Sequence, residues 1–182
     1  MIGENETTMV RFAGFGGQGI VKAGEIFGAA AVADGKRALQ NQSYGSSARG
    51  GLCTADVVVS TGEIHEVEPD HFDVLVALSQ DSCNAFLDQV KPDGLLIVEQ
   101  DLVQLAGEIV ARVRRIPATQ IAAQDLGRRI VTNMVVLGFC SALTGLIGRE
   151  ALEATVRESV PRGTEELNLK AFAEGWRRGA EG

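Results

Sequence analysis

The sequence predicts an α/β fold, an open Rossmann-like layered sheet that is mostly parallel and carries helices on both faces. Candidate strands and helices alternate along the chain, which is the order that produces such a sheet. The first candidate strand is followed directly by a glycine turn and a helix, which is how a βαβ unit begins. Two further runs, FDVLVALS at 72–79 and GLLIVE at 94–99, are nearly all apolar, as strands covered on both faces are.

The first half of the chain is expected to contain four strands and two helices. Residues 9–13 form an apolar run before the glycine turn, and residues 20–33 are rich in Ala, Ile and Val and end at Asp34-Gly35, a helix stop. The other strands are expected at 37–41, 54–60 and 72–79, and the second helix at 81–90. That helix ends before the turn signal Lys91-Pro92-Asp93-Gly94.

The second half of the chain is expected to contain two strands and then helices only. The strand at 94–99 is followed by a more exposed one at 109–116, where apolar residues alternate with arginines. Helices are expected at 121–146, with a break near Gly127, at 149–159 and at 164–178. The stretch 130–148 has no charged residue, but its hydroxyl and amide side chains and three glycines favour a buried core helix, so we expect no membrane span.

Length and composition favour one domain. The chain has 182 residues, of which 45% are hydrophobic, and a single domain is the usual expectation for a length near roughly 150 residues. We expect a disordered tail at 1–8 and one domain at 9–182. The net charge of −7 argues against a nucleic-acid partner. The three scattered cysteines argue against a disulfide scaffold and favour the reducing cytoplasm.

The glycine turn GFGGQG at 14–19 matches the dinucleotide-binding pattern G-x-G-x-x-G. Binding of NAD also requires an acidic residue about 20 residues later, at the end of the second strand, and QNQ at 40–42 offers amides there. A phosphate-binding P-loop is excluded because Ile20 and Val21 stand where Lys and Ser or Thr are required. The turn therefore either binds a phosphate or packs against protein, and the spacing alone favours packing.

A second loop, QSYGSSARGG at 42–51, is too rich in serine and glycine to fill a core. Its Arg49 can bind a carboxylate or phosphate, although the same composition also suits a solvated turn. Both glycine loops follow predicted strands. We therefore expect them to lie together at the carboxyl edge of the sheet, where open α/β folds bind ligands.

Several motifs occur in a characteristic order from about residue 10 to residue 175. They are GFGGQG, QSYGSSARGG, LVALSQ at 75–80, PDGLLIVEQDLV at 92–103, IPAT at 116–119, NMVVLG at 133–138 and NLKAFAEG at 168–175. Together they resemble the gamma subunit of 2-oxoacid:ferredoxin oxidoreductases. Within that family the loop at 42–51 is most similar to the 2-oxoglutarate branch, through Gln-Ser-Tyr-Gly and Ala-Arg-Gly-Gly. Ser46-Ser47 departs from the Pro-Glu that is common there.

The resemblance implies a subunit of a larger enzyme that oxidatively decarboxylates a 2-oxoacid, here 2-oxoglutarate, with coenzyme A to acyl-CoA, carbon dioxide and reduced ferredoxin. The implied partners are thiamine-binding alpha and beta subunits, an optional ferredoxin-like delta subunit, and ferredoxin as electron acceptor. The complex would use thiamine diphosphate, Mg²⁺, iron–sulfur clusters and coenzyme A. The chain alone is expected to bind none of these and to be inactive, since three scattered cysteines cannot ligate a cluster.

No residue is assigned a catalytic or metal-binding role. His65 and His71 are expected at the surface, because no nucleophile or carboxylate motif accompanies them. The candidates for contact with coenzyme A or another subunit lie in the two glycine loops: Gly14, Gly16, Gly17, Gln18, Gly19, Ser43, Tyr44, Gly45, Arg49 and Gly50.

Three other functions stay open at this point. The chain could be a free-standing nucleotide-binding oxidoreductase domain, a non-enzymatic interaction domain, or the beta subunit of an indolepyruvate oxidoreductase, which shares this domain. The Gln-Ser-Tyr-Gly loop favours the 2-oxoglutarate branch over the last of these.

Overall fold

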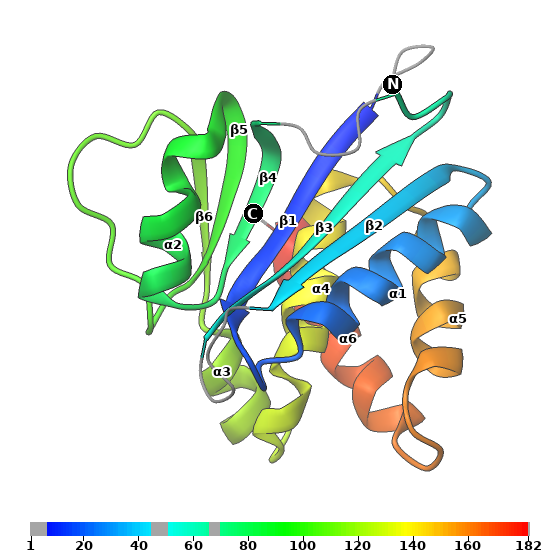
Figure 1. Ribbon diagram of the computed structural model, residues 1–182. Coiled ribbons are helices and arrows are strands. Elements are labelled where there is room, and N and C mark those ends of the chain that lie inside the picture. Colours follow the sequence, from blue (N-terminus) through cyan, green and yellow to red (C-terminus); the bar gives the residue numbers. More distant parts are fainter. Residues whose placement is uncertain (1–6, 45–50, 66–69, 182) are drawn as a thin grey trace.

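The computed structural model describes residues 7–44, 51–65 and 70–181, and its centre is one six-stranded sheet with helices on both sides (Figure 1). The strands are β1 (Thr7–Phe15), β2 (Arg37–Tyr44), β3 (Leu52–Ser60), β4 (Phe72–Ala77), β5 (Val90–Glu99) and β6 (Arg112–Ile116). Their order across the sheet is β2-β3-β1-β4-β5-β6. The expected α/β class is confirmed.

Strand β3 runs against its neighbours. It pairs antiparallel with both β1 and β2, whereas β1, β4, β5 and β6 pair in parallel. Strand β2 therefore points the same way as β1, and the ends of these five strands form one edge of the sheet, the carboxyl edge, at Phe15, Tyr44, Ala77, Glu99 and Ile116. In the register of the sheet, Gly14 and Tyr44 both lie opposite Cys53.

Helices cover the two faces of the sheet unequally (Figure 1). One face carries α1 (Ile20–Ala33), α4 (Thr132–Thr144), α5 (Arg149–Ser159) and α6 (Glu165–Glu181). Most of the core lies on this side, where the rings of Phe12 and Phe27 meet edge to face with centroids 5.7 Å apart. The other face carries α2 (Gln80–Phe86), which packs with a smaller apolar cluster around Leu75 and Leu96.

Within the uncharged stretch at 130–148, α4 forms a buried core helix, as expected. Residues 133–141 of α4 are all buried, and no helix in the described part of the chain is both long and apolar enough to cross a membrane. Helix α6 crosses α4 at backbone contact. A Cβ added to Gly138 would lie 2.0 Å from the carbonyl oxygen of Phe172, and one added to Gly175 would lie 1.9 Å from that of Val135.

Several element boundaries differ from the expected ones. Strand β1 begins at Thr7, so the boundary expected at residue 9 is two residues late, and residues 1–6 of the expected tail lie outside the described residues. The turn expected at 91–94 falls within β5, which pairs with β4 from Val90 through a register shift. Pro92 is exposed there, and an irregular pairing tolerates proline because it demands fewer ladder hydrogen bonds. Strand β6 is shorter than 109–116.

The helix expected at 121–146 consists of separate pieces, and the predicted break near Gly127 is confirmed. After the short turns η1 (Leu87–Gln89) and α3 (Ala118–Gln120), the π-turn η2 (Ile121–Asp125) ends before Gly127, whose φ is +71°. A 3₁₀ turn, η3 (Arg129–Val131), then leads into α4, and Gly145 ends α4 in the left-handed conformation.

An ion pair fixes β1 to β3 on the face that α2 partly covers. Arg11 donates from Nε and Nη2 to the two carboxylate oxygens of Asp56, at 2.6 and 2.5 Å. The guanidinium lies over the rings of Phe72 and Phe86, 4.0 and 4.6 Å from their centroids. A bidentate pair backed by aromatic rings is geometrically specific, so it helps to set the register of the two strands that lead to the glycine loops.

Candidate functional site

The turn between β1 and α1 needs three of its glycines for its own conformation. A Cβ on Gly14 would lie 2.4 Å from Oε1 of Gln18, and one on Gly19 would lie 2.4 Å from Nδ2 of Asn133. Gly17 and Gly19 also have positive φ, 94° and 72°. Gly16 differs, because it is exposed, its φ is ordinary and an added Cβ would meet nothing within 4 Å. The described part of the chain therefore gives no steric reason for a glycine at 16.

Gln18 acts inside the turn. Its Oε1 accepts a hydrogen bond from the backbone N–H of Phe15 at 2.6 Å, and its Nε2 donates to the carbonyl oxygen of Leu78 at 3.0 Å. Since Leu78 directly follows β4, the Gln18 amide ties the ends of β1 and β4 together. The second N–H of this amide has no partner among the described residues.

The described end of the second loop, Gly51, lies beside the first glycine loop at the carboxyl edge. The backbone N–H of Gly16 donates to the carbonyl oxygen of Gly51 at 3.3 Å, which joins the first loop to the end of the second. Ser43 and Tyr44 are exposed at the end of β2, and Tyr44 keeps 64% of its surface. Three candidates of the second loop, Gly45, Arg49 and Gly50, lie outside the described residues.

A cavity of about 320 Å³ opens beside the first glycine loop, the carboxyl-edge cavity. Its lining residues are Gly17, Gln18, Thr119, Arg129, Ile130 and Thr132. The last four come from the segments after β6 and before α4, and none of them was a candidate from the sequence. Ile130 is 84% exposed, and Arg128 and Arg129 are exposed and form no ion pair with any other described residue.

The start of α4 adds to the positive character of this cavity. Val131 occupies the N-cap position and supplies no side-chain hydrogen bond, so the first backbone N–H groups of α4 lack a side-chain cap. A helix of 13 residues carries a partial positive charge at this end. Together with Arg129 it favours an anionic group in the cavity.

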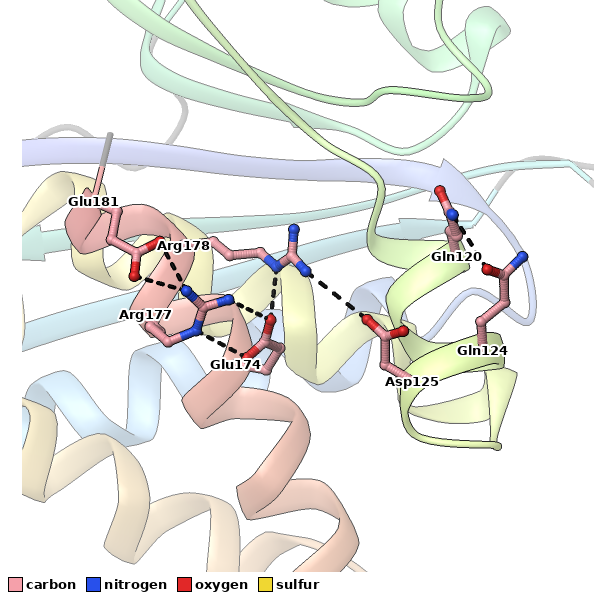
Figure 2. A network of polar contacts seen from close by, with 7 residues as sticks. All are labelled: Gln120, Gln124, Asp125, Glu174, Arg177, Arg178 and Glu181. Atoms are coloured by element: carbon pink, nitrogen blue, oxygen red, sulfur yellow. Dashed lines mark hydrogen bonds and ion pairs between the residues drawn. The ribbon is translucent and has the colours of Figure 1, made fainter.

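Polar contacts between α6 and η2 hold the segment that leads to this wall (Figure 2). Nη2 of Arg178 lies 3.8 Å from the carboxylate of Asp125, and its Nε donates to Glu174 at 2.7 Å. Arg177 also donates to Glu174, and its hydrogen bonds lower the pKa of the Glu174 carboxyl to about 2. Exposed pairs of this kind contribute at most about 1 kcal/mol each to stability. We therefore assign the network the role of orienting η2 relative to α6.

Glu99 is a buried carboxylate behind the cavity, and sequence reasoning missed it as well. It ends β5, is 1% exposed, and accepts hydrogen bonds at Oε2 from the N–H and the Oγ1 of Thr119, at 2.9 and 3.0 Å. Burial raises the pKa of the Glu99 carboxyl, and the hydrogen bonds from Thr119 oppose that shift.

The residues that line the carboxyl-edge cavity include no carboxylate, histidine or cysteine, and Glu99 lies behind it. The thiols of Cys53, Cys83 and Cys140 are buried, and burial raises their pKa, to about 12 for Cys140. Within the described ranges, no three His, Cys, Asp or Glu side chains gather in a way that could hold a metal ion. His65 and His71 are exposed. The arrangement suits binding of an anionic molecule or of another protein.

Comparison with known proteins places the chain in a family. Residues 9–178 match the model of the family described as pyruvate ferredoxin/flavodoxin oxidoreductase. The KorC subunit of 2-oxoglutarate synthase from Methanocaldococcus jannaschii is 42% identical over 170 residues, which cover 92% of this chain and 91% of that one. The resemblance to the 2-oxoglutarate branch that the motifs indicate is thereby confirmed.

Solved structures of related proteins have the same fold as this chain. The gamma subunit of a keto/oxoacid ferredoxin oxidoreductase from Geobacter sulfurreducens superposes with a TM-score of 0.86 at 39% identity, covering 96% of this chain and 99% of that one. A 2-oxoglutarate:ferredoxin oxidoreductase from Magnetococcus marinus contains the same fold, with a TM-score of 0.87 at 24% identity, within 31% of a longer chain. The chain therefore belongs to the pyruvate ferredoxin/flavodoxin oxidoreductase family.

Proposed function

We propose that the chain is the gamma subunit of a complex that oxidatively decarboxylates 2-oxoglutarate with coenzyme A, yielding acyl-CoA, carbon dioxide and reduced ferredoxin. The support is the 42% identity, along nearly the full length of both chains, to a subunit of 2-oxoglutarate synthase. Alpha and beta subunits would hold thiamine diphosphate with Mg²⁺, and iron–sulfur clusters would carry electrons to ferredoxin, with a ferredoxin-like delta subunit in some assemblies. In such a complex this chain would help to form the binding site and would not itself carry out the decarboxylation.

The carboxyl-edge cavity is the observation on which the proposed contact rests. Arg129, Gly17 of the glycine turn and Thr132 at the start of α4, a helix without a side-chain cap, all line it. Coenzyme A carries several phosphate charges, and an arginine beside exposed backbone N–H groups suits phosphate oxygens. We propose that this edge, with Ser43, Tyr44 and the loop at 45–50, faces coenzyme A in the complex.

The substrate is tested by producing the chain with its neighbouring subunits and assaying a panel of 2-oxoacids with an artificial electron acceptor. The expected result is a complex that retains thiamine diphosphate and shows its highest kcat/KM with 2-oxoglutarate. A higher kcat/KM with pyruvate, 2-oxoisovalerate or indolepyruvate would replace the proposed substrate. Recovery of the chain without any partner would contradict the assignment as a subunit.

The coenzyme A contact is tested with Arg129→Ala in the assembled complex. Loss of one charged hydrogen bond to a phosphate is expected to raise the KM for coenzyme A about 10-fold and to leave the KM for 2-oxoglutarate unchanged. Arg112→Ala is the matched control, because Arg112 is also exposed without an ion pair to the described residues but lies at the opposite end of β6. If Arg129→Ala weakens assembly of the complex and does not change the KM for coenzyme A, this edge contacts another subunit instead. The same assay on Arg49→Ala tests the second loop.

A further inference from the structure

The Glu99 carboxylate is buried at a position where its charge destabilises the folded chain. It is 1% exposed, and no Lys, Arg or His of the described chain lies within ion-pair distance of it. Its hydrogen-bond partners are Thr119 and, at 3.4 Å, the backbone N–H of Asp101. A buried charge without a cation is unfavourable for folding. The role of Glu99 must therefore lie in the groups to which it is hydrogen-bonded.

What Glu99 holds is the start of a helical turn. Thr119 is the second residue of α3, and its backbone N–H is one of the donors that a helix start leaves without an intrahelical partner. The N-cap residue of α3, Pro117, supplies no side-chain hydrogen bond. Glu99, which lies beside the end of β6 in the register of the sheet, satisfies this N–H from a neighbouring strand and takes the Thr119 hydroxyl as well.

Thr119 is also part of the wall of the carboxyl-edge cavity, together with Gly17 and Arg129. The hydrogen bonds of Glu99 thus fix one wall of the cavity from behind, at a residue that does not itself line it. The opposite wall is fixed separately, by the internal hydrogen bonds of Gln18. One wall is therefore held by a buried carboxylate at the end of β5, and the other by a half-buried amide in the turn after β1.

We propose that Glu99 is a positioning residue for the carboxyl-edge cavity, acting through Thr119 on the site that receives coenzyme A. This inference rests on the proposed function of that cavity. An amide at 99 can keep the essential contact, because its oxygen accepts the same two hydrogen bonds from Thr119. A methyl group at 99 leaves both donors without a partner, and the wall is then free to shift.

The test compares Glu99→Ala with Glu99→Gln in the assembled complex. Glu99→Ala is expected to raise the KM for coenzyme A about 10-fold while kcat changes less than about twofold, and Glu99→Gln is expected to stay within about twofold of the parent. Glu150→Gln removes an exposed carboxylate on α5 and serves as the matched control for lost charge. A purely structural role would reduce the amount of assembled complex without this split between KM and kcat, and without rescue by the amide.

Thr119→Val supplies a second variant of the same contact. If Glu99→Ala does not assemble, Thr119→Val provides the test: it keeps the backbone N–H, removes the hydroxyl, and is expected to raise the KM for coenzyme A about threefold. An unchanged KM in assembled Glu99→Ala or Thr119→Val, with a raised KM in Arg129→Ala, would overturn the role of Glu99 and leave the proposed function standing. An unchanged KM in all three variants would overturn both the role of Glu99 and the proposed coenzyme A contact.

Discussion

The crossing of α4 and α6 can be tested with a single methyl group at Gly175. A Cβ there would lie 1.9 Å from the carbonyl oxygen of Val135 and 2.7 Å from its carbon, and these are backbone atoms that cannot turn aside. Carbon atoms essentially never approach closer than 3.0 Å in this setting, so the two helices must separate by more than about 1 Å. A gap of that size forfeits up to about half of the dispersion energy along the contact.

The expected cost of Gly175→Ala follows from two opposing effects. Overpacking of a tight core contact destabilises a protein by about 3 kcal/mol at the upper end of its usual range, whereas alanine favours the helix by about 1 kcal/mol over glycine. The net loss is about 2 kcal/mol. In a chain of this length that corresponds to a fall in Tm of roughly 4–8 °C.

Thermal and urea unfolding of the full chain measure this change, with Gly28→Ala as the matched control. Gly28 is also a buried helical glycine, but its added Cβ would lie 3.5 Å from the Val57 side chain, an ordinary contact. Gly28→Ala is therefore expected to raise stability by up to about 1 kcal/mol. Equal shifts in the two variants, or a stabilised Gly175→Ala, would refute the close crossing of α4 and α6.

Three further predictions concern polar groups. Ser141→Ala is expected to raise the free energy of unfolding by up to about 1 kcal/mol in urea denaturation, because the buried Ser141 hydroxyl has no hydrogen-bond partner among the described residues. A loss of stability would mean that it has one. Gln18→Ala is expected to lower it by about 1–3 kcal/mol, because Phe15 N–H and Leu78 C=O lose their partner, and an unchanged Tm would contradict that role. The raised pKa of Glu99 means that the native state binds its proton more tightly than the unfolded chain, whose value is near 4.5, so stability falls as pH rises from 4.5 through the folded pKa. Glu99→Gln should flatten that part of the stability profile, and equal slopes in the two proteins would argue against it.

The order of strands and helices could be predicted because each apolar run is bounded by turn residues. The direction of β3 was not part of that prediction, since an apolar run such as 54–60 looks the same beside parallel and antiparallel neighbours. The expected bounds did not help either, because strands at 37–41 and 54–60 leave twelve residues between them, about the length that a parallel crossover requires. The observed strands are longer, β2 ends at Tyr44 and β3 begins at Leu52, and the shorter connection suits an antiparallel pair.

The candidate site could be predicted in part. The glycine spacing indicated a turn at 14–19. The two loops were expected to meet because both follow predicted strands, and the contact between Gly16 and Gly51 agrees with this at the one described end of the second loop that it involves. The wall at Thr119 and Arg129 was missed because the uncharged stretch at 130–148 suggested a single buried helix, whereas α4 begins at Thr132 and leaves Ile130 exposed. Glu99 was missed because an acidic residue at the end of an apolar strand usually lies at the surface. Here the junction between β6 and α3 covers it, and this junction is visible only in the fold.

The interposed strand β3 limits what this glycine turn could be engineered to bind. In a dinucleotide-binding fold the second strand lies beside the first, so that its terminal carboxylate reaches the ribose of a nucleotide held at the turn. Here β3 separates the two, and β2 lies two strand spacings, about 10 Å, from β1. An aspartate installed at Gln40 would be too distant to hold that ribose. Conversion to an NAD-dependent protein would thus require a different strand order in the sheet, which point substitutions cannot supply.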